Sequence, residues 1–286
     1  MTPAALSATP CLVCSGPSRR FAVIRGFLLR QCEQCDLVFR RVQALPPAEL
    51  AGLFGKTYFA GTETDGYVDY LATEAALRRQ ARRYLSLLER ARGGKGTLFD
   101  VGCAVGFLLD EARQRGWQVA GCDPSPWASR YARERLGLPI RIGAFDDEAT
   151  DDARAAERDL SAVTFLNVLE HCANPARAVA WAERALVSGG VVLVETWDRD
   201  SVAARLSGRR WHQWSPRRVR SWFNRSSLEA LFPHRTWEWL RFGPVVRWLP
   251  LARGLEVVGA PPIGALGRIL LPYGLGDLVA LHVRKR

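Results

Sequence analysis

The residues near the start of the chain that are best suited to chemistry are four cysteines in two closely spaced pairs. Cys11 and Cys14 form one pair and Cys32 and Cys35 the other, with 17 residues between them. Two such turns can offer four thiolates to one tetrahedral zinc ion, a closed site with a structural role. Four unrelated cysteines or a redox-active C-x2-C pair are the alternatives. We expect residues 1–45 to form a zinc-binding knuckle, because so short a segment cannot fold on its own core.

A second group of residues combines acids with glycines. Asp100 lies at the end of an apolar run, Gly102 and Gly106 follow it, and Asp123 ends the next apolar run about 20 residues further on. Glycines at such positions let the backbone turn tightly and approach a ligand closely. An acid that ends a second strand can bind both hydroxyls of a ribose. The pattern predicts a site for a nucleoside-containing cofactor.

The charge of this loop distinguishes between two cofactors. A nicotinamide dinucleotide usually meets G-x-G-x-x-G, since its diphosphate lies at a helix N-terminus. Here Ala104 stands where that pattern has glycine, and Asp100 precedes the loop. A carboxylate repels a diphosphate but attracts the ammonium group of a methionine moiety. We therefore predict S-adenosylmethionine, with an ordinary ligand-free strand–helix turn as the alternative.

The elements that must position these residues alternate between strand and helix. Strands alternating with helices indicate βαβ units and a parallel sheet, so we predict an α/β fold. We divide the chain into the knuckle at 1–45, a linker with an N-terminal helix at 46–96, and a cofactor-binding domain at 97–286. Apolar runs predict strands at 98–101, 118–122, 140–144, 162–166 and 191–195, and helical patterns cover 73–92, 107–115, 127–136, 175–186 and 226–232.

Two stretches of the sequence resemble class I S-adenosylmethionine-dependent methyltransferases. DVGCAVGFLLDEARQRGWQVAGCDPS resembles motifs I and II of that family, and TFLNVLEHCANPARAVAWAERALVSGGVVLVET is similar to its fourth- and fifth-strand regions. The likeness covers about residues 70–245. The knuckle followed by YF and GYVDY is similar to small bacterial methyltransferases of the methyltransferase-23 type, which are often linked to sugar or cell-envelope biosynthesis. Ser161 departs from the family, which usually has an acid there.

The resemblance implies a Rossmann-like, seven-stranded, mostly parallel sheet that ends in an antiparallel hairpin, with its last strands at about 236–242 and 278–283. It also implies the residues that contact the cofactor. These are Asp100, Gly102 and Gly106, with Cys103 in the same loop, around the methionine moiety; Asp123 at the ribose; Pro124, Ser125, Phe145 and Asp146 around the adenine; and Asn167 and Leu169 beside the methionine and the transfer site.

An oxygen or nitrogen acceptor must lose a proton, so a catalytic base is needed. His171 follows Glu170 after the fourth predicted strand, and His212 lies within RRWHQWSPRR, a segment that resembles the one bordering the acceptor in the family. For each histidine the alternative is a structural residue that shapes its loop. Arginines near His212 can clamp an anionic acceptor or form a solvated basic face: Arg209, Arg210, Arg217, Arg218 and Arg220.

Composition limits the remaining possibilities. With 286 residues, 48% hydrophobic and 24% charged, the chain is neither disordered nor fibrous. We find no signal-peptide or transmembrane pattern and expect a cytoplasmic protein with reduced thiols. A net charge of +11 leaves nucleic acid, an anionic acceptor or a membrane surface open as partners.

The predicted function is methyl transfer to a small molecule such as a sugar, nucleotide sugar or cell-envelope precursor. An RNA methyltransferase and a non-catalytic zinc-linked binding protein are the alternatives. The apolar stretch 243–276 is expected to pack between the last two strands, with a lid over the acceptor or peripheral membrane contact as its alternatives.

Overall fold

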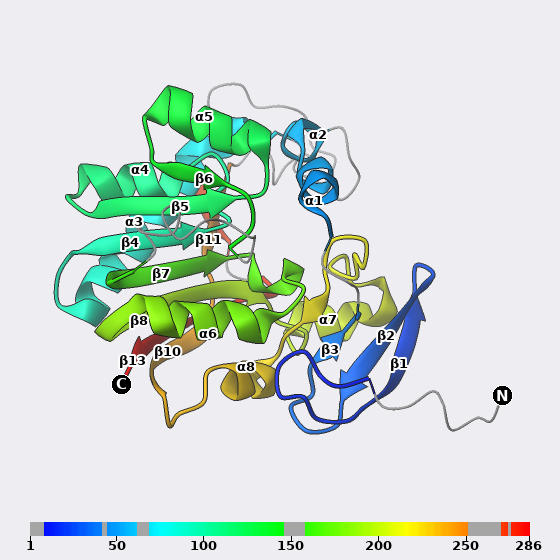
Figure 1. Ribbon diagram of the computed structural model, residues 1–286. Helices are drawn as coiled ribbons and strands as arrows, with labels where there is room; N and C mark the ends of the chain where they lie inside the picture. The colour runs from blue at the N-terminus through cyan, green and yellow to red at the C-terminus, as the bar shows by residue number, and fades with distance from the viewer. Residues whose placement is uncertain (1–8, 42–44, 62–68, 146–157, 251–269, 274–275) are drawn as a thin grey trace.

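A computed structural model describes residues 9–41, 45–61, 69–145, 158–250, 270–273 and 276–286. Its centre is a seven-stranded sheet in the order β10-β13-β8-β7-β4-β5-β6. The five strands β8, β7, β4, β5 and β6 run parallel, and β13 runs antiparallel to both of its neighbours. This confirms the predicted α/β fold (Figure 1). The strands are β4 (Thr97–Val101), β5 (Gln118–Asp123), β6 (Ile140–Ile142), β7 (Leu160–Leu166), β8 (Leu186–Trp197), β10 (Trp237–Pro244) and β13 (Leu278–Lys285).

All seven strands of this sheet differ from their predicted bounds by one or more residues, and two of these differences have local backbone reasons. β6 ends at Ile142 instead of residue 144, because Gly143 adopts a φ of 132° and donates its N–H to the carbonyl of Asp123. β8 begins at Leu186, which was predicted to be helical. Leu186 has extended φ and ψ angles and pairs with Leu160, so the preceding helix ends at Ala185.

Helices cover both faces of the sheet. Residues paired across parallel strands point to the same face, and two buried clusters show which helices each face meets. Leu98, Ala162 and Leu193 pack against α3 (Glu74–Arg92) and α4 (Phe107–Gln114). The opposite face, with Phe165 among its residues, packs against α6 (Pro175–Ala185) and α8 (Arg225–Leu231). Helix α5 (Pro126–Leu136) packs beside β5 and β6.

The N-terminal segment forms a second, four-stranded sheet from β1 (Ser18–Ile24), β2 (Phe27–Cys32), β3 (Val38–Phe39) and β9 (Ser221–Trp222). β9 comes from far along the chain and pairs antiparallel with β3. The N-terminal sheet is therefore completed by a strand from outside residues 1–45. Three cysteines of the N-terminal segment, Cys11, Cys32 and Cys35, also belong to the buried cluster around α6 and α8.

Short elements surround the carboxyl ends of the parallel strands. Helices α1 (Pro47–Leu53) and α2 (Lys56–Phe59) lie on that side of the sheet, as does α7 (Val202–Ser207), which lies near the N-terminal sheet (Figure 1). β11 (Arg247–Pro250) and β12 (Leu270–Tyr273) form a separate antiparallel pair. Most of the apolar stretch 243–276 lies outside the described residues. Among the described helices, none is both long and apolar enough to cross a membrane.

Candidate cofactor cleft and cysteine cluster

The predicted cofactor residues gather where β4, β5 and β7 end. Three cavities of about 310, 470 and 130 Å³ are all lined by Gly102 at this edge. The first lies on the α3 side and includes Asp100 and Cys103; the second lies on the α6 side and includes Pro124 and Phe145. The smallest shares Asn167 with the first and Pro124 with the second, and it includes Asp123. Together they form one cleft along the carboxyl edge.

The loop after β4 winds tightly at this edge. Gly102, Ala104 and Gly106 all have left-handed backbone angles, with φ of 70°, 49° and 87°. A Cβ atom on Gly102 would lie 2.5 Å from a methyl group of Val168, so only glycine fits. Gly106 begins α4, where a Cβ atom would lie 2.5 Å from Leu138. Gly106 therefore serves helix packing, and it lines none of the three cavities.

Asp123 is the better anchored of the two predicted acids. Its carboxylate accepts hydrogen bonds from the backbone N–H groups of Ser125 and Ala104, each at 2.8 Å. Burial raises its pKa to about 6, and the two hydrogen bonds oppose that rise. Ser125 is fully buried and caps α5 by accepting a hydrogen bond from Ala128, so it shapes the cleft without lining it.

Asp100 is a buried carboxyl group on the wall of the first cavity. The Thr164 hydroxyl on neighbouring β7 donates to it at 2.6 Å. Burial raises its pKa to about 7, the charge of Asp123 adds to the rise, and the Thr164 hydrogen bond opposes it. A cationic ligand in this cavity would favour the ionised carboxylate.

The inner wall of the first cavity contains polar residues that the sequence analysis did not identify. Glu195 accepts hydrogen bonds from Asn167, at 2.8 Å, and from Arg247. Its second carboxylate oxygen is buried and has no hydrogen-bond partner among the described residues, and the same holds for the side-chain amide of Gln80 and the hydroxyl of Tyr84. Buried polar atoms without partners are costly, so water or a ligand in this cavity must supply hydrogen bonds to them.

Two features of the sequence indicate this wall, because both place polar residues within otherwise apolar elements. Gln80 and Tyr84 are polar residues one turn apart on the otherwise apolar, buried face of α3. Glu195 is an acid within the apolar run Val191–Thr196, where a strand buried on both faces carries charge only with a partner.

His171 lines the second and third cavities. Its Nδ1 lies 3.1 Å from the backbone carbonyl of Arg218, which can only accept, so Nδ1 carries the hydrogen and Nε2 is unprotonated. Burial lowers its pKa to about 4. His171 is therefore a neutral imidazole at the cleft and a weak proton acceptor. The preceding Glu170 is fully buried, and burial raises its pKa to about 7 although Thr196 donates a hydrogen bond to it.

Several predicted residues lie outside the cleft. His212 is exposed, with Nε2 at 3.7 Å from Asp277 and its ring beside Trp197, and it lines none of the three cavities. Leu169 is fully buried below the loop, and Asp146 lies outside the described residues. Arg220, by contrast, belongs to the cleft, because it is buried and lines the second cavity. Arg218 is buried over the ring of Tyr58 and lines none of the three cavities. Arg209, Arg210 and Arg217 are exposed.

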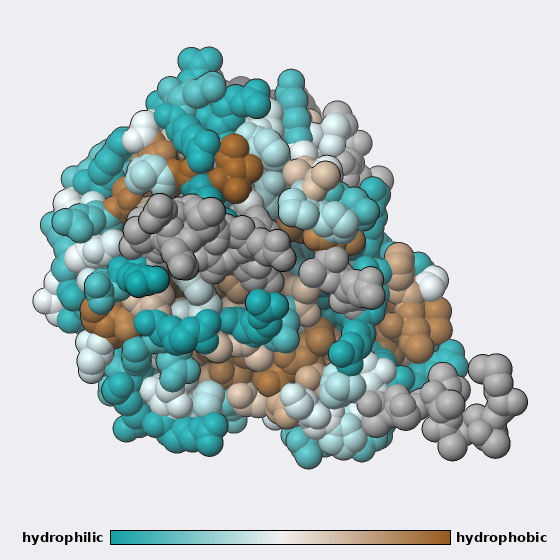
Figure 2. Space-filling model, in the orientation of Figure 1, coloured by the Kyte–Doolittle hydropathy of each residue, from teal (hydrophilic) through white to brown (hydrophobic). Residues whose placement is uncertain are grey.

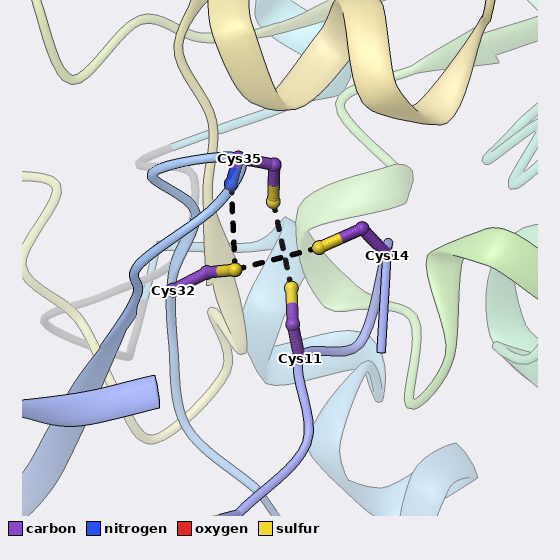
Figure 3. Close-up of side chains that lie close together, drawn as sticks. All are labelled: Cys11, Cys14, Cys32 and Cys35. Carbon is purple, nitrogen blue, oxygen red and sulfur yellow. Dashed lines mark hydrogen bonds between the residues drawn. The ribbon is translucent and has the colours of Figure 1, made fainter. Parts of the chain in front are cut away.

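The four N-terminal cysteines point toward a common centre (Figure 3). All four sulfur atoms lie within 4.8 Å of one another, with Cys11 and Cys35 at 3.5 Å and Cys14 and Cys32 at 3.4 Å. Zinc–sulfur bonds of about 2.3 Å place tetrahedral sulfurs about 3.8 Å apart, so the cluster fits zinc. Backbone N–H groups of Val13, Gln34 and Cys35 point at the sulfurs, as donors to thiolates would. The hydrogen bond with Cys35 lowers the pKa of the Cys11 thiol, which favours a thiolate at that position.

Comparisons with known proteins agree with this fold. A family of methyltransferase domains matches residues 74–239. The ubiquinone biosynthesis O-methyltransferase of Alkalilimnicola ehrlichii is 34% identical over 104 residues, which is 36% of this chain and 42% of that protein. The enzyme of the same name from Cereibacter sphaeroides is 29% identical over 131 residues, 44% of this chain and 52% of that one. The chain thus spans about half the length of these curated relatives.

Solved structures share the fold. The magnesium protoporphyrin IX methyltransferase of Synechocystis, crystallised with S-adenosylhomocysteine, superposes with a TM-score of 0.55 at 12% identity, covering 84% of this chain and all of that one. The protein is thus Rossmann-like, with a cleft at the carboxyl edge of its sheet. Since the family match covers more than half of the sequence, the chain belongs to this family of methyltransferase domains, as the resemblance predicted.

Burial of Asp100 leads to a pH-dependent prediction. The folded protein keeps the Asp100 proton up to about pH 7, whereas an ordinary aspartate releases it near 3.8. Between these values the folded state binds more protons than the unfolded state, so this group lowers the free energy of unfolding as pH rises. Asp100→Asn keeps an acceptor for Thr164 and removes the charge. We expect the free energy of unfolding of Asp100→Asn to exceed that of the wild type by up to about 4 kcal/mol near pH 8 without ligand. Near pH 4 the two free energies should differ little.

Urea denaturation of both proteins across this pH range measures the difference. Asp159→Asn, which changes an exposed acid, is the matched control and should follow the wild type. A constant difference between Asp100→Asn and the wild type at all pH values would contradict the buried titration.

Proposed function

We propose that the cleft binds S-adenosylmethionine and that the protein transfers its methyl group to a small molecule. The observation that carries the proposal is the acidic edge of the cleft, with Asp100 and Asp123 at the ends of adjacent strands inside a chain of this family. The cofactor supplies an electrophilic methyl group when bound. The protein's task is to orient the acceptor and exclude water.

The proposed position of the cofactor follows the three cavities. The adenine lies in the second cavity beside Pro124 and Phe145, the ribose hydroxyls bind the Asp123 carboxylate, and the methionine ammonium faces Asp100 in the first cavity. Each Asp123 oxygen already accepts one backbone N–H and keeps a second lone pair for a hydroxyl. Asp146 remains part of this proposal from the family resemblance alone.

The inner wall of the first cavity supports a neutral, hydroxyl-bearing acceptor. Glu195 is paired with Arg247, and Asp100 would be paired with the cofactor ammonium, so neither charge requires a charged acceptor. The second oxygen of Glu195 has no partner among the described residues and requires a hydrogen-bond donor, and the Gln80 amide can both donate and accept. Hydroxyl groups meet both needs, which fits a sugar or related cell-envelope precursor better than an anionic acceptor.

The proton acceptor of the reaction is part of the same proposal. His171 is the histidine that borders the cleft, and its unprotonated Nε2 can accept a hydrogen bond from an acceptor hydroxyl. With a pKa of about 4 it orients the hydroxyl better than it removes its proton. The exposed His212 has no such position and is the weaker candidate.

Methyl transfer can be tested with isotopically labelled S-adenosylmethionine and a fractionated bacterial extract. We expect label in the small-molecule fraction and none in RNA. Label in RNA would favour the alternative function. Asp123→Ala should stay folded, lose transfer and bind S-adenosylhomocysteine at least about tenfold more weakly in calorimetry, because hydrogen bonds to a charged group are lost. Asp159→Ala is the control. Undiminished binding by Asp123→Ala would contradict the ribose assignment.

We further propose that the cysteine cluster binds a structural zinc ion and that the protein works where thiols stay reduced, as in the cytoplasm. Four thiolates leave no open position for water, so the ion would serve folding. The cluster anchors the N-terminal sheet, whose strand β3 pairs with β9. The residue before β9, Arg220, donates its N–H to the carbonyl of Glu170 at 2.7 Å. Zinc would therefore stabilise the cleft wall at His171 indirectly.

Metal analysis of the purified protein tests the cluster. We expect about one zinc per chain in the wild type, and Cys32→Ser should lose the metal and expose residues 9–41 to limited proteolysis. Cys122→Ala removes a cysteine that is equally buried but lies outside the cluster, and it should retain zinc. A zinc-free wild type prepared without chelators would refute the site.

A further inference from the structure

Exposed apolar side chains lie on two segments that contribute to one buried cluster. Among the described residues, six large hydrophobic side chains are exposed, and five of them lie on the β1–β2 hairpin or on α7. Val23 and Leu28 are paired across the hairpin and are 47% and 45% exposed, and Phe27 beside them is 36% exposed. Val202 and Leu206, one turn apart on α7, are 74% and 85% exposed. Figure 2 shows apolar surface at the projecting end of the molecule where Figure 1 places the hairpin.

The opposite sides of the same two segments are buried, so these residues face outward. Ala22, Ile24 and Leu29 of the hairpin and Ala204 of α7 belong to one buried cluster, which also contains Trp211, Trp214 and Trp222. The hairpin and α7 are therefore held on a common base, and their second apolar sides are left without a core to cover them. A grouped apolar surface of this kind indicates an interaction site.

The surroundings of these residues are strongly basic. Residues 18–31 and 201–220 contain ten arginines and no aspartate or glutamate. Seven of these arginines are exposed: Arg19, Arg20, Arg25, Arg205, Arg209, Arg210 and Arg217. Guanidinium groups bind phosphate oxygens well. The occupant of this surface must therefore combine negative phosphates with an apolar interior.

We propose that the β1–β2 hairpin and α7 form a docking surface for membranes that contain anionic phospholipids. Aliphatic side chains would enter the boundary between headgroups and acyl chains, and the arginines would contact headgroup phosphates. RNA is a poorer match, because single strands are bound by stacking of successive bases on several exposed aromatic rings. Among the described residues of this surface Phe27 is the one large aromatic side chain that is exposed, and Arg40 lies over its ring, whereas Trp211, Trp214 and Trp222 are 6% exposed or less. A second copy of the chain is also disfavoured, since a symmetric contact would bring arginines against arginines.

The test is co-sedimentation of the full-length protein with vesicles of phosphatidylglycerol mixed with phosphatidylcholine, compared with vesicles of phosphatidylcholine alone. We expect binding to the anionic vesicles that weakens as salt is added. The double variant V202S/L206S should bind at least about tenfold more weakly, because two aliphatic side chains no longer leave water. Ile142→Ser changes the sixth exposed residue, which lies on the central sheet away from this surface, and should bind like the wild type.

Failure of the wild type to bind anionic vesicles at low salt, or equal binding by V202S/L206S, would overturn the proposal. So would tight binding of polyuridylate that survives V202S/L206S but is lost in R209E/R210E, because that result assigns the surface to RNA. S-adenosylhomocysteine titration of the same variants should be unchanged, so failure here is distinguishable from failure of the proposed methyl transfer.

Discussion

Four carboxyl groups are buried where the parallel strands end, and this constraint governs what the cleft can accept. Asp100, Asp123, Glu170 and Glu195 are each 6% exposed or less. Negative charges in the interior are costly unless a cation or hydrogen-bond donor faces them. Part of that compensation comes from the hydroxyls of Thr164 and Thr196, from two backbone N–H groups, and from the Asn167 and Arg247 side chains, which both donate to Glu195. At Asp100, Asp123 and Glu195, which line the cavities, a ligand with an ammonium group and several hydroxyls would supply the rest, and a diphosphate would not.

The N-terminal sheet belongs to the same arrangement. Pairing of β3 with β9 places the segment from Arg218 to Phe223 between the cysteine cluster and the loop of Glu170 and His171. The carbonyl of Arg218 fixes the tautomer of His171, and the N–H of Arg220 bonds to Glu170. The ion pair of Arg199 with Asp36 joins the two sheets at a further point. The state of the cysteine cluster should therefore influence the cleft, although no cysteine of the cluster lines it.

The sequence predicted those features that depend on local chemistry. Cysteine spacing predicted a cluster that the fold brings together, and D-x-G-x3-G with Asp123 predicted the cleft edge, because strand ends and glycine turns are set by neighbouring residues. The pairing of β3 with β9 was beyond the sequence, since two-residue strands far apart in the chain have no periodic pattern. The wall of Gln80, Tyr84 and Glu195 was missed because each residue stands within an otherwise ordinary apolar element. His212 was chosen from its sequence neighbours, but its ring lies at the surface.

The proposed binding of S-adenosylmethionine requires a cleft that attracts a cationic amino-acid tail and repels a diphosphate. Calorimetric titration of the wild-type protein with S-adenosylmethionine and, separately, with NAD+ compares the two directly. We expect saturable binding of S-adenosylmethionine and none of NAD+ under the same conditions. Binding of NAD+ with rejection of S-adenosylmethionine would contradict it.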